Sequence, residues 1–405
     1  MRIALLLLFS HERSFSDLLE SDIKGNVWNE IFYEKQDVED RYAKELTDEG
    51  HDCTLYFLSY KRERKEGIHK FGHRVVRLPI DFAVKGIFGY EFSSSLLNEL
   101  SKQQYDVIFI VSSYYTHFVP FFFMDTYDLT AFFCSKKRWR IISNYAGGSY
   151  KYIPCKYLAP ARWWVKKKAL TLSDKIVTES KVEAKTLMDV FGINERRIAF
   201  LRNPVNLELF HKIPKEACAE YLGKDADKKY VLFVGHICER KGISDLISAF
   251  GFMVKKYPDM QLLVVGYGAD KSNVVQTVKR MNIDNSVSFE GFVPNEKLKF
   301  FYSLADMFVL PSYDEGMPNV VLEALACETP TIATTVGDIP SLPNGLLLKV
   351  PRGNRTRLLE AMQKIINGEF KINESQRSSL LEECSIKNHQ VNLKKIIEET
   401  LQHRV

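Results

Sequence analysis

The sequence predicts an α/β protein with two doubly wound domains, each built on a mostly parallel β-sheet. A chain of 405 residues is long enough for two such domains. Short apolar runs alternate with amphipathic segments, beginning with a strand at residues 1–10, a helix at 37–48 and a second strand at 53–58. The same alternation starts again at residues 230–235 (YVLFVG), which predicts the second domain.

Composition and charge narrow the class of protein. The chain is 45% hydrophobic and 26% charged, which is ordinary for a soluble globular protein. Its net charge of +5 is small and gives no reason to expect a nucleic-acid partner. The seven cysteines are scattered without the paired spacing of metal ligands, so we expect reduced thiols and no metal site.

The apolar start of the chain, MRIALLLLFS, predicts a buried parallel strand. It meets charged residues at once and no small-residue cleavage site follows, which argues against a signal peptide. No segment approaches the ~18 uninterrupted apolar residues that a membrane span needs. We therefore expect a cytoplasmic protein.

Further strands of the first domain are expected at residues 75–79, 107–112 and 140–143. The segment between the last two, residues 114–134, is dense in aromatic side chains. A core helix and strand is the favoured interpretation, because aromatic residues at such spacing most often belong to a core. The alternative is an acceptor groove or a surface that dips into a membrane.

A basic, tryptophan-containing segment follows at residues 156–168, and residues 136–140 repeat the mixture. Helices that lie on anionic membranes combine these residue types, so Trp163 and Trp164 could enter an interface while residues 166–168 meet lipid headgroups. The other interpretation is a solvated run of charges with extended lysine side chains. The sequence leaves both interpretations open.

The second half contains the elements of a complete doubly wound domain. After the strand at 230–235, helices are predicted at residues 243–257 and 319–327, and a last helix at 388–402. The remaining strands are expected at residues 261–265, 287–290, 304–310, 331–335 and 346–350.

The segment 311–330 (PSYDEGMPNVVLEALACETP) carries the clearest functional pattern. Gly316 permits an unusual turn, and Pro318 suits the first position of a helix because its missing N–H is not needed there. The amides at the start of that helix favour an anionic group. The helix is apolar on all sides except for Glu323, so this carboxylate needs hydrogen-bond donors, which ligand hydroxyls can supply. Glu315 lies at the mouth of the same turn.

The loop after the strand at 230–235 contains Glu239, Arg240, Lys241 and Gly242 before the next helix. This could be a polar turn only. Its position between a buried strand and a helix start favours phosphate binding by the basic side chains.

Residues 311–330 resemble the donor-site signature of the retaining, family-4 glycosyltransferases of the GT-B fold, in which two glutamates hold a nucleotide sugar. The segments 202–206 and 336–341 are similar to that family's crossover and its Val-Gly-Gly-Ile-Pro-Glu motif. The resemblance implies the GT-B architecture of two Rossmann-like domains facing each other across a cleft.

The resemblance also sets the expected domain limits. Residues 1–205 would form the acceptor domain and residues 206–387 the nucleotide-sugar donor domain. The helix in residues 388–405 would pack back onto the first domain.

By this resemblance, Glu315 contacts hydroxyls of the transferred sugar and Glu323 contacts the ribose. Lys241 and Arg240 would pair with the donor diphosphate and stabilise the leaving group. Donor contacts are also implied for Gly235, His236, Gly316, Met317, Pro318, Asn319, Val320, Phe292 and Val293, the last two beside the base.

Three departures from the family pattern fall where relatives contact the donor, and Asp338 and Ser341 are two further departures within residues 336–341. The loop after the first strand lacks the usual Gly-Gly pair, and Ala146 stands where a histidine touches the donor sugar in relatives. Gly147 and Gly148 follow it and still allow close backbone approach to a ligand. His236 occupies the place of the arginine that normally pairs with the diphosphate.

The resemblance implies a retaining, metal-independent glycosyltransferase without a cofactor, in which fixed cations replace a metal ion. The expected donor is a UDP-sugar. The acceptor would be a hydroxyl of a glycan, lipid-linked or small-molecule substrate in polysaccharide or glycolipid biosynthesis, with peripheral contact to an anionic membrane. The alternatives are a nucleotide-sugar epimerase or phosphorylase of the same fold, and a non-catalytic partner subunit.

Overall fold

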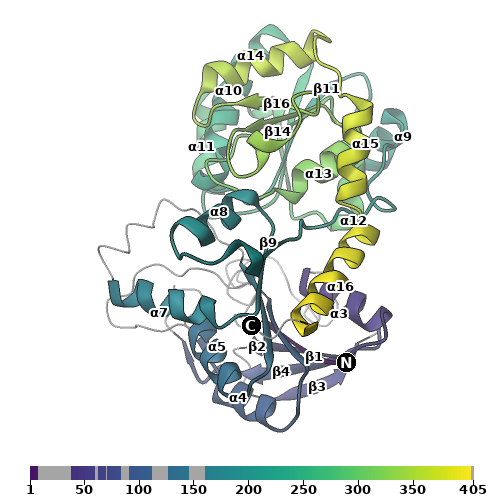
Figure 1. Ribbon diagram of the computed structural model, residues 1–405. Coiled ribbons are helices and arrows are strands. Elements are labelled where there is room, and N and C mark those ends of the chain that lie inside the picture. The colour runs from purple at the N-terminus through teal and green to yellow at the C-terminus, as the bar shows by residue number, and fades with distance from the viewer. Residues whose placement is uncertain are drawn as a thin grey trace. The chain divides into compact units, whose positions relative to one another are not determined.

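The computed structural model describes residues 1–7, 38–59, 63–69, 71–83, 91–111, 126–145 and 160–402. These residues divide into two units. The first contains residues 1–201 together with 390–405, and the second contains residues 202–389. Each unit is built on its own β-sheet with the parallel, helix-covered arrangement of a Rossmann-like domain (Figure 1). The predicted fold class of two such domains is confirmed.

The first unit has an eight-stranded sheet in the order β10-β9-β8-β7-β1-β2-β4-β3, in which only β3 runs antiparallel to its neighbour. Its central strands are apolar on both faces, because a parallel strand flanked on each side and covered by helices meets no water. The strands are β1 (Arg2–Leu7), β2 (Asp52–Ser59), β3 (Lys65–Ile68), β4 (Arg74–Pro79), β7 (Val107–Val111), β8 (Arg140–Tyr145), β9 (Lys175–Thr178) and β10 (Ile198–Phe200).

The helices of this unit are α3 (Val38–Asp48), α4 (Ser94–Ser101), α5 (Thr126–Lys136), α7 (Pro160–Thr171), α8 (Lys181–Asp189) and the 3₁₀ turn η2 (Glu195–Arg197). A separate two-stranded sheet pairs β5 (Phe82–Ala83) with β6 (Glu91–Phe92). The last helix, α16 (Ile386–Gln402), contributes Leu393 and Ile397 to the same apolar cluster as Ile3 and Leu5 of β1. Residues from the two ends of the chain therefore share one core.

The second unit has a six-stranded, all-parallel sheet in the order β13-β12-β11-β14-β15-β16. Its strands are β11 (Lys229–Val234), β12 (Met260–Val265), β13 (Val287–Gly291), β14 (Met307–Leu310), β15 (Thr331–Thr334) and β16 (Leu348–Val350). Its helices are α9 (Lys215–Leu222), α10 (Ile243–Lys256), α11 (Lys271–Arg280), α12 (Asn295–Leu304), α13 (Asn319–Ala326), α14 (Arg355–Ile366) and α15 (Glu374–Glu383), with 3₁₀ turns η3 (Glu239–Lys241), η4 (Asp284–Ser286) and η5 (Ile339–Ser341).

The two faces of this sheet are covered by different helices (Figure 1). Alternate residues of β11 show why: Val231 and Phe233 join the cluster under α10, α11 and α14, whereas Leu232 joins the cluster under α9, α12, α13 and α15. Since side chains of a strand alternate between faces, a strand covered on both sides must be apolar throughout. This is the continuous apolar run that the sequence shows.

One expected strand is shorter than predicted. Of the apolar run 304–310, Leu304 ends α12 and only Met307–Leu310 forms β14. Asp306 explains the boundary, since its carboxylate accepts hydrogen bonds from the Tyr230 backbone N–H and from the Lys215 ammonium. A charged residue with these partners marks the entrance of the strand.

The basic helix α7 uses part of its charge internally. The Lys166 side chain is 1% exposed, and its Nζ lies 3.0 Å from Asp128 Oδ1 and 4.6 Å from the ring centroid of Tyr127. The expectation that all of residues 166–168 meet lipid headgroups is therefore wrong for Lys166. Trp164, by contrast, is 55% exposed.

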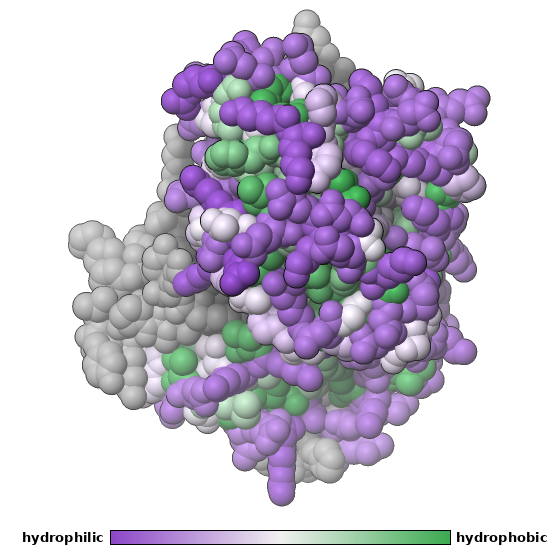
Figure 2. All heavy atoms as spheres, turned by 90° about the horizontal axis from the view of Figure 1, so that it is seen from above, coloured by the Kyte–Doolittle hydropathy of each residue, from purple (hydrophilic) through white to green (hydrophobic). Residues whose placement is uncertain are grey.

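The described surface shows no extended apolar face in the view of Figure 2, where hydrophilic residues surround small, separate apolar spots. Within the described ranges, no helix combines the length and the apolar composition needed to cross a bilayer.

The loops that follow β11 and β14 touch through their backbones. Gly242 adopts φ +67°, and a Cβ atom at this position would lie 2.0 Å from the Pro311 carbonyl oxygen. Only glycine fits such a contact in the left-handed conformation. The approach therefore fixes the spacing of the two loops.

We predict that Gly242→Ala destabilises the second unit more than Gly223→Ala does. Both glycines have similar φ values, +67° and +62°, but a Cβ at Gly223 would meet nothing within 4 Å. Gly223→Ala should cost about 1–2 kcal/mol for the left-handed conformation alone. Gly242→Ala should cost a further ~1–3 kcal/mol for the steric overlap.

The measurement is the free energy of unfolding from urea titrations of the two variants and the parent. Equal losses for the two substitutions would show that the backbone contact adds nothing to the strain of a positive φ.

Candidate active site

The candidate site is built from loops at one edge of the second sheet. β11 pairs in parallel with β14, so the loops that follow the two strands leave from the same edge. In open α/β sheets this carboxyl edge is where ligands bind. The loop after β11 carries Arg240 and Lys241, and the loop after β14 carries Glu315.

An ion pair joins the two loops. Lys241 Nζ lies 2.6 Å from Glu315 Oε1, and the side chains are only 14% and 8% exposed. The Ser312 hydroxyl donates a second hydrogen bond to the same carboxylate oxygen at 2.6 Å. The structure therefore brings together two of the three residues predicted as catalytic, and Ser312 adds a donor that sequence reasoning did not identify.

Arg240, the third predicted catalytic residue, lies on the solvent side of this pair. Its Nη1 donates to the Asp314 carbonyl oxygen at 2.8 Å and lies 3.8 Å from Glu315 Oε2, while the side chain is 51% exposed. The Tyr313 backbone N–H donates to the Arg240 carbonyl oxygen at 2.7 Å. The loops after β11 and β14 are thus also joined by hydrogen bonds to backbone carbonyl oxygens.

Three rings line the carboxyl ends of neighbouring strands. His236 follows β11, Tyr267 follows β12 and Phe292 follows β13. The ring centroids of His236 and Tyr267 are 4.6 Å apart with the rings edge to face, and those of Tyr267 and Phe292 are 6.4 Å apart. Phe292 is 49% exposed, so an apolar ring faces solvent at the same edge of the sheet as the loop that carries Lys241.

His236 is predominantly neutral near pH 7. Burial of the ring, which removes water from its charged form, lowers the pKa of His236 from its usual 6.5. The positive charges of Lys241 and Arg240 lower this pKa further. An imidazole at this position therefore supplies less positive charge than the arginine of the family pattern would.

Within the described residues, polar groups at the start of α13 lack side-chain hydrogen-bond partners. Pro318 lies at the N-cap, one residue earlier than predicted, and gives the first amides of the helix no side-chain acceptor. Asn319 is the first helical residue, and its amide oxygen has no hydrogen-bond partner within the described part of the chain. Met317 is 6% exposed and packs in the core, so only its backbone is available to a ligand. Val320 also packs against this core.

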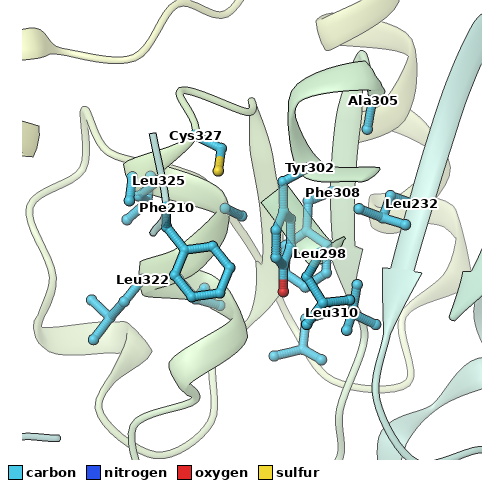
Figure 3. Packing of buried hydrophobic residues seen from close by; sticks show 14 of the residues in the cluster. Phe210, Leu232, Leu298, Tyr302, Ala305, Phe308, Leu310, Leu322, Leu325 and Cys327 are labelled. Carbon is cyan, nitrogen blue, oxygen red and sulfur yellow. The ribbon is translucent and has the colours of Figure 1, made fainter. Parts of the chain in front are cut away.

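Glu323 has a partner inside the protein. The hydroxyl of Tyr302 donates to Glu323 Oε2 at 2.8 Å, and Tyr302 itself is fully buried. Figure 3 shows the Tyr302 ring packed among Phe308 and Leu298, with its hydroxyl at the far end. The prediction that Glu323 requires donors was correct, but a protein hydroxyl supplies one, so a ligand need not be the only source.

The Tyr302 hydroxyl remains a donor at all ordinary pH values. Burial, and after it the Glu323 carboxylate, raises the pKa of Tyr302 well above its usual value. A carboxylate has two oxygens with about four acceptor positions, and the bond from Tyr302 occupies one of them.

Of the remaining predicted residues, three are described by the structure and three are not. Gly235 ends the segment that leads into the His236 loop, the Gly316 carbonyl accepts the Asp338 N–H at 2.9 Å, and Val293 packs against the core. Ala146, Gly147 and Gly148 lie outside the described residues. Among the residues that are described, no three His, Cys, Asp or Glu side chains gather in a way that could hold a metal ion.

The sequence analysis missed Tyr302, which donates to Glu323, and the bonded pair of Asp245 and Tyr313. One signal was available for Asp245. It is an acid in the first turn of a helix that is otherwise mostly buried, and the same argument that singled out Glu323 applies to it. Nothing in the sequence distinguishes Tyr302 from the other tyrosines of the chain.

Comparison with protein families gives one match for each half of the chain. Residues 215–379 match the model described as glycosyl transferases group 1, and residues 40–209 match the model described as glycosyltransferase family 4. The two matches adjoin and together take in most of the chain.

Similar proteins of known name agree with these matches. An uncharacterized glycosyltransferase of Haemophilus influenzae is 30% identical over 57% of this chain and 61% of its own length. The D-inositol 3-phosphate glycosyltransferase of Segniliparus rotundus is 31% identical over 42% of this chain and 38% of its own length. The chain thus spans less than two thirds of these relatives.

Solved structures are similar over almost the whole chain. A sucrose-phosphate synthase from Thermosynechococcus elongatus superposes with a TM-score of 0.73 at 21% identity, covering 99% of both chains. The Anabaena protein HepE, solved with UDP, has a TM-score of 0.69 at 13% identity and covers 98% of this chain and all of its own. These similarities establish the fold.

The chain belongs to the glycosyltransferases of the GT-B fold, as the sequence resemblance implied.

We predict that Tyr302→Phe destabilises the second unit by about 1.5–3 kcal/mol, the usual contribution of a hydrogen bond to a charged group. The phenyl ring keeps the packing and removes only the donor to Glu323. Tyr257→Phe is the control, because the Tyr257 hydroxyl makes one 3.3 Å bond to the exposed Asn367. This substitution should change the free energy of unfolding by no more than about 0.5 kcal/mol. Urea unfolding of both variants measures the difference. A Tyr302→Phe protein as stable as the control would mean that Glu323 does not depend on this hydroxyl.

Proposed function

We propose that this protein transfers a sugar from a nucleoside diphosphate donor to an acceptor hydroxyl. The observation that carries the proposal is the ion pair of Lys241 and Glu315, largely buried at the carboxyl edge of the second sheet. The start of α13, with its uncapped amides, follows Glu315 by four residues. A cation, a carboxylate and helix amides in one place suit a diphosphate joined to a hydroxyl-rich sugar.

The ion pair gives each group a separate task. The Lys241 ammonium has three donors, and within the described residues it makes one hydrogen bond, to Glu315. Its remaining donors can therefore meet diphosphate oxygens while Glu315 holds it in place. As the glycosidic bond breaks, negative charge grows on the leaving diphosphate, and a fixed cation stabilises that charge more than the ground state.

Glu315 and Glu323 would then bind hydroxyls. Glu315 accepts from sugar hydroxyls with the oxygen that is not shared by Lys241 and Ser312. Glu323, held by Tyr302, accepts from the ribose. The exposed ring of Phe292, beside Tyr267, provides an apolar surface for the base.

A UDP-sugar is the donor that we propose, with retention at the anomeric carbon and no requirement for a divalent cation. Support for UDP comes from similar folds that were solved with UDP and with UDP-glucose. Retention and metal independence rest on the family-4 resemblance and on the cations of the η3 turn. The acceptor would be a hydroxyl of a glycan, a lipid-linked or a small-molecule substrate.

A second candidate is a non-catalytic partner subunit that has kept the fold. The observation in its favour is His236, whose lowered pKa leaves a mostly neutral ring where the family has an arginine. The two candidates differ in one measurable property, which is acceptor-dependent release of the nucleoside diphosphate.

The test is a panel of nucleoside diphosphate sugars incubated with glycan and lipid extracts in excess EDTA. We expect UDP release that depends on the acceptor, and a product whose new linkage keeps the donor's anomeric configuration by NMR. Release without any acceptor would indicate an epimerase or a hydrolase. A requirement for added phosphate would indicate a phosphorylase. No release of nucleoside diphosphate with any donor would favour the partner subunit.

We predict that Lys241→Ala lowers turnover about 10²–10³-fold, the loss typical of removing one donor to a transition-state anion. The affinity for UDP should change less, because bound UDP lacks the charge that develops during the reaction. Lys241→Arg should recover part of the rate, since a planar guanidinium replaces a compact ammonium. The exposed Lys255 of α10 provides the control Lys255→Ala, which should leave turnover unchanged. Equal rates for Lys241→Ala and the parent would remove Lys241 from the mechanism.

We predict that His236 makes donor binding depend on pH. Its free pKa lies below 6.5, and a nearby diphosphate favours the protonated ring. The affinity for the donor that His236 supplies should therefore be largest at low pH. It should fall as the pH rises through the pKa of His236 in the free protein and then through its higher pKa in the donor complex. The measurement is the ratio of UDP affinities of the parent and His236→Gln between pH 5 and 8, since this ratio cancels the ionisation of UDP itself. A ratio that stays constant with pH would show that the ring contacts no phosphate.

A further inference from the structure

The buried carboxylate of Asp245 is bonded to the loop that carries Glu315 and has no role in the proposed chemistry. Asp245 occupies the first turn of α10 and is 4% exposed. Its Oδ2 accepts the Tyr313 hydroxyl at 2.7 Å, and its Oδ1 accepts Arg355 Nε at 2.6 Å. Asp245 therefore links the helix that begins after Lys241 to the loop that carries Glu315.

Tyr313 connects to both sides of the site. Its backbone N–H donates to the Arg240 carbonyl oxygen at 2.7 Å, and its hydroxyl reaches Asp245 one helical turn further along the same segment. In return, Arg240 Nη1 donates to the carbonyl oxygen of the adjacent Asp314. The loop after β14 is thus bonded to the segment 240–245 at several points.

Stability alone gives little reason for a carboxylate at this position. Burying a charge is unfavourable unless its partners compensate, and buried ion pairs are often no more stable than apolar replacements. The charged partner here is Arg355, whose side chain is 60% exposed, so water weakens that pair further. What the carboxylate does provide is a directional acceptor for one hydroxyl.

We propose that Asp245 is a positioning residue for the Lys241–Glu315 pair and acts through Tyr313, an inference that rests on the proposed function of that pair. The side chain of Tyr313 anchors the loop two residues before Glu315. Without this anchor, the loop could rotate about its backbone contact with Arg240 and move the Glu315 carboxylate. Lys241, held by that carboxylate, would move with it.

Two substitutions test the anchor in different ways. Tyr313→Phe keeps the ring and removes the hydroxyl, and Asp245→Asn keeps the shape and removes the charge. Tyr230→Phe is the matched control, because the Tyr230 hydroxyl bonds to the Asp225 backbone next to the opposite, amino end of β11. Arg355→Gln tests the exposed ion partner separately.

The first readout needs no substrate. Amide hydrogen exchange at residues 238–242 and 312–316 should accelerate about tenfold or more in Tyr313→Phe and in Asp245→Asn, corresponding to about 1.4 kcal/mol of local opening. Tyr230→Phe should leave exchange in these two segments unchanged. Unchanged exchange in both variants would overturn the proposal, and either variant suffices if the other fails to fold.

The second readout is kinetic. Displacement of the reacting groups by about 1 Å can cost up to ~10²-fold in rate, so Tyr313→Phe should lower kcat about 10- to 100-fold. The KM for the donor should rise by a smaller factor, because Glu315 also binds the donor sugar. Arg355→Gln should change kcat less than about twofold. A KM effect that exceeds the kcat effect would overturn a positioning role.

A double-mutant cycle separates positioning from general damage. If Tyr313 acts through the Lys241–Glu315 pair, then Tyr313→Phe should lower the rate less in a Lys241→Ala background than it does in the parent. Multiplicative losses would mean that Tyr313 acts independently, which contradicts the proposal. If the parent protein transfers no sugar at all, the proposed function fails, and the exchange experiment still decides whether Asp245 orders the two loops.

Discussion

The backbone contact between Gly242 and Pro311 is the constraint on which the candidate site depends. Lys241 precedes this glycine directly, and Glu315 follows the proline by four residues, so the ion pair forms only if the two loops meet here. The loops meet because β11 and β14 are neighbours in the sheet. These strands can be neighbours because each is apolar on both faces and the helices exclude water from both. The position of one ammonium group therefore rests on the core of the whole unit.

Both acids of the site have hydrogen-bond donors before any ligand arrives. Glu315 receives hydrogen bonds from Lys241 and Ser312, and Glu323 receives one from Tyr302. Each acid is held by a donor whose own position is fixed by packing or by a helix start. Preorganised groups of this kind need little rearrangement when charge develops on a ligand, which is the main source of electrostatic catalysis. The same arrangement means that a ligand at these acids must share these partners or displace them.

Family membership and the particular chemistry of this chain are separate conclusions. The matches to glycosyltransferase models and the superposition on solved structures define the family and the fold. The positions that depart from the family pattern are where we expect rate and specificity to differ. His236 is the clearest case, since a ring with a lowered pKa stands where the resemblance implies an arginine. Function must therefore be argued from the site and not from the fold alone.

The sequence by itself predicted the fold class, the six strands of the second unit in their order, two of its helices, α10 and α13, and the segments that carry Lys241 and Glu315. It could do so because strand and helix periodicity, glycine turns and prolines act over a few residues. Only the tertiary structure decided the partners: Tyr302 for Glu323, Tyr313 and Arg355 for Asp245, and the buried Asp128 for Lys166. Each of these pairs joins residues far apart in the chain. Contacts of this kind depend on side-chain directions that are set by packing, and local sequence patterns do not specify those directions.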